Sequence, residues 1–120
     1  MNKKVFIIAE AGINHNGKMR LAKKLVDISK KAGADAVKFQ TFKAENVISK
    51  YAKKLKYQKN KNTDNQSQLE MLKSYELNEK NFIDLKKYCR KKKIIFMSTP
   101  KDIRSAKFLH KIKMSIFKIG

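Results

Sequence analysis

Short apolar runs alternate with longer amphipathic stretches along the whole chain. The apolar runs are strand-sized, the first of them mostly β-branched, and they predict strands over residues 5–9, 36–40, 94–98 and 115–119. The stretches between them space their apolar residues as helices do and predict helices over about 18–32, 67–74, 78–89 and 102–111. Strands that alternate with helices indicate right-handed βαβ units and a parallel sheet.

The ends of two predicted helices carry recognisable signals. Gly33 follows the first helix, where a left-handed C-cap is wanted. Asn78 is a good N-cap for the helix that it precedes, and Leu77 and Phe82 have the spacing of a hydrophobic staple. The buried face of the first helix is expected to consist of four residues at helical spacing: Leu21, Leu25, Ile28 and Ala32.

The connection over about 41–66 is long, polar and lysine-rich. Connections of this length inside a compact domain are usually functional or mobile. We therefore expect this connection to be functional or mobile.

A predicted sheet of this kind closes in one of two ways, as a doubly wound sheet or as part of a (β/α)₈ barrel. No G-x-G-x-x-G follows the first predicted strand, so the fingerprint of dinucleotide binding is missing. A complete barrel needs about 250 residues, and this chain of 120 would supply its first three βα units and a fourth strand.

Composition favours a globular protein with a strongly basic surface. The chain is 42% hydrophobic and carries a formal charge of +20, which raises the possibility of an anionic partner such as nucleic acid. However, the excess is almost entirely lysine, spread over every segment, and no nucleic-acid-binding motif is present. No apolar run is long enough to cross a membrane. We expect a cytoplasmic protein that binds neither nucleic acid nor membrane.

The single cysteine, Cys89, can form neither an internal disulfide nor a zinc cluster. It lies on the apolar side of a predicted helix. We expect it to be a buried core residue.

Polar residues gather near the carboxyl ends of the predicted strands, where parallel α/β folds bind ligands. They are Glu10, Lys38 with Gln40, Ser98 with Thr99, and Lys118. Lys38 and Gln40 share one face of their strand because strand side chains alternate. A lysine in an apolar strand is costly to bury without an anionic partner, although it can also snorkel to the surface.

Two such lysines and nearby hydroxyl groups suit a small ligand that carries a phosphate and a carboxylate. Glu10 could hold sugar hydroxyls, or it could pair with a lysine. The residues alone leave both alternatives open.

Four motifs together resemble the sialic acid synthase family. They are IAEAGINHNG at 8–17, AGADAVKFQTF at 32–42, FMSTP at 96–100 and FKIG at 117–120, and the segments 43–46 and 67–71 also fit. The resemblance covers essentially the whole chain in the right order. It implies that residues 1–120 are the N-terminal part of a (β/α)₈ barrel, with the rest of the barrel and a C-terminal antifreeze-like domain absent.

The resemblance implies that phosphoenolpyruvate condenses with open-chain N-acetylmannosamine. Carbon C3 attacks the aldehyde, water adds at C2, and phosphate leaves by C–O cleavage. Lys38, Thr99 and Lys118 match residues that bind phosphoenolpyruvate, while Glu10 and Gln40 match residues that contact the amino sugar. We expect Lys38, Lys118 and Glu10 to be the catalytic residues.

The resemblance also implies parts that lie beyond this chain. A divalent ion, Mn²⁺ or Mg²⁺, would polarise the aldehyde, with ligands outside these residues, and the whole enzyme would be a homodimer. The family also uses a polar residue from the loop before the second helix, and Thr63, Asp64 and Asn65 lie near that place. His15 is expected to shape the first βα loop rather than to bind metal, and His110 to lie on the surface or in packing.

Three readings of function stay open at this point. The first is a sialic-acid-type synthase, including the legionaminic and pseudaminic acid variants; the second is a related enolpyruvate-condensing enzyme. The third is a basic, non-catalytic binding module. Because the expected metal ligands and several barrel strands are absent, we expect a fragment, split reading frame or truncated product that is inactive alone.

Overall fold

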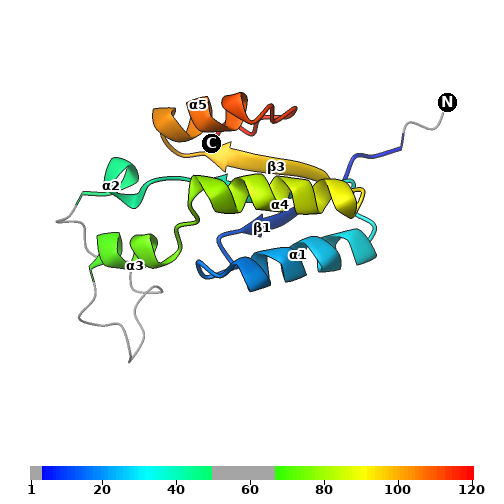
Figure 1. Cartoon of the computed structure of the whole chain (residues 1–120), viewed down its shortest axis with the longest axis horizontal. Helices are drawn as coiled ribbons and strands as arrows, with labels where there is room; N and C mark the ends of the chain where they lie inside the picture. Colours follow the sequence, from blue (N-terminus) through cyan, green and yellow to red (C-terminus); the bar gives the residue numbers. More distant parts are fainter. Residues whose placement is uncertain (1–3, 50–66) are drawn as a thin grey trace.

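The computed structural model describes residues 4–49 and 67–120. It contains a parallel sheet in which three strands follow one another in chain order (Figure 1). These are β1 (Ile8–Gly12), β2 (Ala36–Thr41) and β3 (Ile95–Pro100). The connections contain α1 (Met19–Lys31), α2 (Ala44–Val47), α3 (Gln68–Ser74) and α4 (Glu79–Lys91), and α5 (Ile103–Lys111) follows β3.

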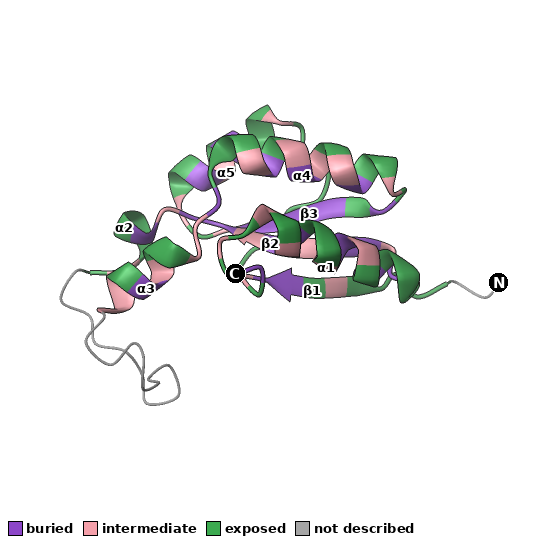
Figure 2. Cartoon of the chain, turned by 60° about the horizontal axis from the view of Figure 1, so that its bottom comes forward, coloured by how far each residue is buried: buried purple, intermediate pink, exposed green. Residues whose placement is uncertain are grey.

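One hydrophobic core joins the sheet to three helices. Val37 and Phe39 of β2 point into it, and so does Phe96 of β3, the register partner of Val37. Figure 2 shows the buried stripe of each helix turned toward the sheet. The stripes consist of Ala22 and Val26 of α1, Phe82, Leu85 and Cys89 of α4, and Phe108 and Leu109 of α5.

Aromatic rings hold the layers of this core together. The rings of Phe39 and Phe96 stack across the sheet at 6.2 Å between centroids, and Phe82 of α4 meets Phe108 of α5 at 6.4 Å. Burying one such side chain stabilises the fold by about 1.5–3 kcal/mol. The first contact joins β2 to β3 and the second joins α4 to α5, and all four rings belong to the one core.

The opposite face of the sheet carries the polar candidates. Strand register places Glu10 beside Lys38, Lys38 beside Met97, and Gln40 beside Thr99. Residues that are in register across a sheet point to the same face. Helix packing on one face thus leaves a row of polar side chains on the other.

Several local predictions are confirmed. Gly33 adopts φ +82° after α1, and the Ala34 N–H donates to the Ser29 carbonyl, as expected of a left-handed helix end. Asn78 caps α4 and exchanges hydrogen bonds with Asn81. Cys89 is fully buried, and burial raises the pKa of its thiol to about 12.

The first predicted strand is displaced toward the C-terminus. Strand β1 begins at Ile8 rather than Val5, and Val5 is 74% exposed instead of buried on both faces. The reason is that β2, its neighbour, begins at Ala36, which pairs with Ile8. Ahead of that pair, the Ile7 N–H donates to the Asp35 carboxylate, which ends the ladder.

The buried face of α1 also differs from the prediction. Ala22, Val26 and Ser29 are buried, whereas Ile28 is 52% exposed. The two sets of residues are neighbours on the helix surface, so both fit helical spacing. Packing against β1, β2 and α4 selects the set with smaller side chains.

The last predicted strand and the long connection differ from expectation as well. Residues 115–119 form no strand in the described part of the chain; a single parallel bridge joins Ser98 to Phe117. One bridge is too few for a strand, because a strand needs a run of consecutive ladder hydrogen bonds with its neighbour. Within 41–66, the short helix α2 was not expected, and residues 50–66 lie outside the described residues.

The turn after β1 is pressed against the segment that joins α3 to α4. Gly17 has φ +69°, and a Cβ added there would lie 2.3 Å from the Ser74 carbonyl oxygen. Gly33 has a similarly positive φ, but a Cβ there would meet nothing within 4 Å. A side chain at either glycine would therefore strain the backbone, but only at Gly17 would it also clash with a neighbouring atom.

We predict that Gly17→Ala destabilises the chain more than Gly33→Ala. Both variants should lose about 1–2 kcal/mol from a left-handed alanine, and Gly17→Ala roughly 1–3 kcal/mol more from the clash. Urea unfolding of both variants beside the parent chain measures the difference. Equal losses in the two variants would contradict the close approach to Ser74.

Candidate functional site

A charged pair stands on the face of the sheet opposite the helices. Glu10 of β1 and Lys38 of β2 are register partners, and their side chains form an ion pair. The Lys38 side chain is only 12% exposed and that of Glu10 56%. The carboxylate offsets part of the cost of desolvating the ammonium group, so the pairing predicted as one alternative for Glu10 is present.

Gln40 joins this pair at the end of β1. A Cβ at Gly12 would lie 3.6 Å from Glu10 Oε1 and 3.7 Å from Gln40 Nε2, so the acid and the amide converge on one point. Asn14 Nδ2, 3.9 Å from the same point, donates to the Ala11 carbonyl and closes the turn. Acceptor and donor groups side by side can bind hydroxyl groups of a ligand.

Thr99 and Lys118 lie farther along the same edge. Thr99 stands opposite Gln40 and is buried, and its methyl group lies 3.6 Å from the position of a Cβ at Gly120. The Lys118 ammonium donates to the Ile119 carbonyl at 2.6 Å. In the described part of the chain, no hydrogen bond or ion pair joins Lys118 to Glu10, Lys38, Gln40 or Thr99.

Ser98 faces the helices instead of the ligand. It alternates with Thr99 along β3, is fully buried and shares a 2.7 Å hydrogen bond with the Thr41 hydroxyl. Of the two hydroxyl candidates, Thr99 alone lies on the polar face. Ser98 joins the ends of β2 and β3.

His15 shapes the turn after β1, as predicted. Its Nδ1 accepts a 3.0 Å hydrogen bond from the Gly17 N–H, and its ring lies 6.1 Å from that of Phe39. The ring is fully buried, and burial lowers the pKa of the imidazole. Nε2 has no hydrogen-bond partner among the described residues. His110 is exposed on α5.

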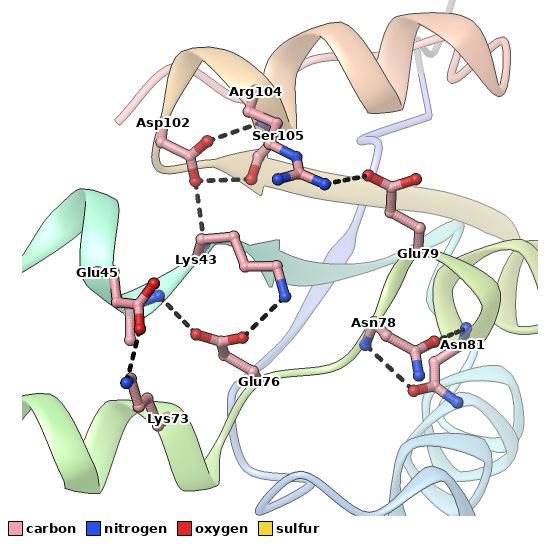
Figure 3. Close-up of polar contacts among 11 residues, drawn as sticks. Lys43, Glu45, Lys73, Glu76, Asn78, Glu79, Asn81, Asp102, Arg104 and Ser105 are labelled. Carbon is pink, nitrogen blue, oxygen red and sulfur yellow. Dashed lines mark hydrogen bonds and ion pairs between the residues drawn. The ribbon is translucent and has the colours of Figure 1, made fainter.

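Two carboxylates that the sequence reasoning missed hold the loop after β2 (Figure 3). Glu76 accepts from the Ala44 N–H at 2.6 Å and from the Lys43 ammonium at 3.1 Å. On the other side, Asp102 accepts from the Lys43 N–H at 3.1 Å. The loop that follows Lys38 and Gln40 is thereby fixed between the start of α5 and the segment before α4.

Asp102 could have been found from the sequence, since it is an N-cap residue that follows a strand-ending proline. It caps α5 by accepting from the Ser105 N–H at 2.9 Å and the Ser105 hydroxyl at 2.7 Å. Burial acts to raise the pKa of this carboxyl, but the hydrogen bonds from Ser105 and Lys43 outweigh it and lower the pKa below 3.8. Glu76 gave no comparable sequence signal.

Two expectations concern parts that the structure does not supply. Thr63, Asp64 and Asn65 lie outside the described residues. Within 4–49 and 67–120, no three His, Cys, Asp or Glu side chains are placed to hold a metal ion, so these residues do not fit the expected divalent site. The described helices include none long and apolar enough to span a membrane.

The model of the NeuB family matches residues 25–120. This chain belongs to the NeuB family. The match confirms the resemblance to sialic acid synthases that the motifs indicated.

Two relatives of this NeuB-family chain are named as synthases. It is 49% identical over 117 residues to an N,N'-diacetyllegionaminic acid synthase of Campylobacter jejuni, covering 98% of the chain and 35% of that protein. It is 30% identical over 115 residues to the human N-acetylneuraminate-9-phosphate synthase, covering 96% of the chain and 32% of that protein.

A solved structure agrees with this fold. The crystal structure of an N-acetylneuraminic acid synthetase from Leptospira borgpetersenii, in complex with citrate, superposes with a TM-score of 0.75 at 36% identity. The superposition covers 98% of the NeuB-family chain and 36% of the synthetase. The chain therefore spans about a third of the length of these relatives.

We predict that Asp102→Ala destabilises the chain in a pH-dependent way. Loss of the N-cap should cost roughly 1–2 kcal/mol at pH 7. Because the folded-state pKa is lowered, this stabilisation is present above pH 3.8 and is lost as the pH falls through the folded value. Urea unfolding at pH 7 and at pH 3 should show a deficit that shrinks in acid.

Asp84→Ala serves as the control for this prediction, because Asp84 of α4 makes no ion pair or hydrogen bond with another described residue. A deficit for Asp102→Ala that is equal at both pH values would contradict the role of the ionised carboxylate.

Proposed function

We propose that this chain supplies the first third of a synthase that condenses phosphoenolpyruvate with N-acetylmannosamine, or a related N-acetylated amino sugar, and releases phosphate. The observation that carries the proposal is the Glu10–Lys38 ion pair with Gln40 beside it, on the helix-free face of a NeuB-family sheet. A non-catalytic basic module offers no reason for a nearly buried lysine to stand on that face.

The proposed fold of the complete enzyme is a (β/α)₈ barrel. The strands follow in the order β1-β2-β3, and the core packs α1, α4 and α5 against one face. A doubly wound sheet carries helices on both faces, whereas a barrel keeps them outside and turns the other face inward. The polar row of Glu10, Lys38, Gln40 and Thr99 would then line the interior at its carboxyl end.

In the proposed reaction, the anionic substrate is held by cations and hydroxyl groups of this edge. Lys38 and Lys118 would bind the phosphate and carboxylate of phosphoenolpyruvate, with the Thr99 hydroxyl as a further donor. Binding both groups fixes the position of C3 relative to the sugar aldehyde, which lowers the entropic part of the barrier. Because Lys38 already pairs with Glu10, its ammonium group would contact both the Glu10 carboxylate and the substrate.

The amino sugar would lie against Glu10 and Gln40. The carboxylate accepts hydrogen bonds from sugar hydroxyls, and the Gln40 amide both donates and accepts. Carbon C3 of phosphoenolpyruvate forms a bond to the aldehyde carbon, whose oxygen takes up a proton. Water adds at C2, the C–O bond to phosphate breaks, and a 2-oxo acid results.

The remaining parts of the enzyme are proposals that rest on the family. We expect a divalent ion, Mn²⁺ or Mg²⁺, held by residues outside those described, and the steps above use none of its chemistry. We also expect the further barrel strands, a C-terminal antifreeze-like domain, a homodimer and a cytoplasmic location.

A second sugar is compatible with the comparisons. Identity to the C. jejuni N,N'-diacetyllegionaminic acid synthase is 49%, against 30% for the human N-acetylneuraminate-9-phosphate synthase. A diacetamido sugar is therefore the alternative acceptor. Both acceptors would use the same enolpyruvate site.

A chimera tests the function, because the chain spans only about a third of its relatives. Residues 4–120 would replace the matching segment of the C. jejuni synthase. We predict sugar-dependent phosphate release from phosphoenolpyruvate by the chimera, lost at least 100-fold in Lys38→Ala because an anion-binding cation near the reacting atoms is removed. The isolated chain should show no turnover.

Lys24→Ala, on the exposed side of α1, is the matched control and should leave the rate unchanged. A folded chimera that releases no phosphate with either sugar would sink the proposal. Release that persists in Lys38→Ala would remove Lys38 from the site.

A further inference from the structure

The charge balance at the carboxyl edge leaves the proposed substrate short of cations. The Glu10 carboxylate already balances the Lys38 ammonium, and the Lys118 ammonium donates to a backbone carbonyl. Phosphoenolpyruvate carries both a phosphate and a carboxylate, whereas of these two lysines only Lys118 keeps a charge that no acid balances. Another positive group near Thr99 would correct this balance.

Lys101 is placed to supply that charge. It directly follows β3, which ends at Pro100, and so lies just beyond the carboxyl end of the strand that carries Thr99. Its backbone N–H donates to the Thr41 carbonyl at 3.0 Å, which fixes its Cα to the end of β2. The residue is exposed, so its ammonium can reach a ligand without desolvation.

The ammonium of Lys101 lies close to Thr99 and the C-terminal segment. A Cβ at Gly120 would lie 3.8 Å from Lys101 Nζ and 3.6 Å from Thr99 Cγ2. No carboxylate in the described part of the chain forms an ion pair with Lys101. The adjacent Asp102 carboxylate is turned to Ser105 and the Lys43 N–H.

We propose that Lys101 is a substrate-binding residue that holds the phosphate group of phosphoenolpyruvate beside Thr99. This inference rests on the proposed function and extends it to a lysine that the motifs did not single out. With Lys101, the edge gains one cation that is not balanced by an acid. The mobile four-carbon stem lets that cation follow the phosphate as it leaves.

Binding to the 120-residue chain tests this proposal separately from turnover. Amide spectra of the ¹⁵N-labelled chain would be recorded during titration with phosphoenolpyruvate, inorganic phosphate or pyruvate. We predict shifts at Thr99, Lys101 and Gly120 with the two phosphate-bearing probes. Lys101→Ala should weaken both by about tenfold, the loss of one charge-assisted hydrogen bond, and leave pyruvate unaffected.

Two variants control for charge and chemistry. Lys107→Ala removes the same charge from the exposed side of α5 and should change affinity less than twofold. Lys101→Arg keeps the charge and should retain most of the affinity. Equal weakening by Lys101→Ala and Lys107→Ala would overturn the inference, because it would reveal a bulk charge effect.

Failure of the parent chain to show any shift near Thr99 would also overturn the inference. The assay of phosphate release by the chimera would still test whether the chain supports the proposed condensation. The two proposals can therefore fail independently.

Discussion

The ion pair between Glu10 and Lys38 is the interaction on which the polar face of this sheet depends. A lysine whose side chain is 12% exposed carries a large desolvation cost, and the facing carboxylate offsets it. Removing one partner would leave the other charge unpaired on a partly desolvated surface. Strand register controls this pairing, since a slip by one residue would turn Lys38 toward the aromatic core.

The same register separates two kinds of surface within one strand. Val37 and Phe39 pack against the helices, while Lys38 and Gln40 stand on the opposite side. The core therefore positions the site without contributing side chains to it. Any ligand on the polar face meets groups whose backbone is held by buried rings behind them, which is the preorganisation that electrostatic binding needs.

Contacts between loops give the carboxyl edge its rigidity. Glu76 and Asp102 hold Lys43 from two sides, and Gly17 lets the first turn approach the backbone at Ser74. Three connections are thus tied together just beyond the strands. The polar residues of the site come from the strands. The loops around them are held in place by residues to which no role in binding or catalysis is assigned.

The local order of the fold could be predicted from the sequence because local physics decides it. Apolar runs, the Asn78 cap and the glycine after α1 act over a few residues, and strand alternation alone placed Lys38 and Gln40 on one face. The motifs also placed Glu10 and Thr99 at the correct edge. Membership of the NeuB family followed from the order of those motifs.

Tertiary structure decided what depends on distant partners. Only the register of β1 on β2 chose Lys38 for Glu10 in a lysine-rich chain, and only helix packing buried Val26 while leaving Ile28 exposed. The expected fourth strand is reduced to one bridge between Ser98 and Phe117, a pairing with β3 that the apolar pattern of residues 115–119 does not reveal. Glu76 and Lys101 gave no local signal, since their roles arise from groups brought near them by folding.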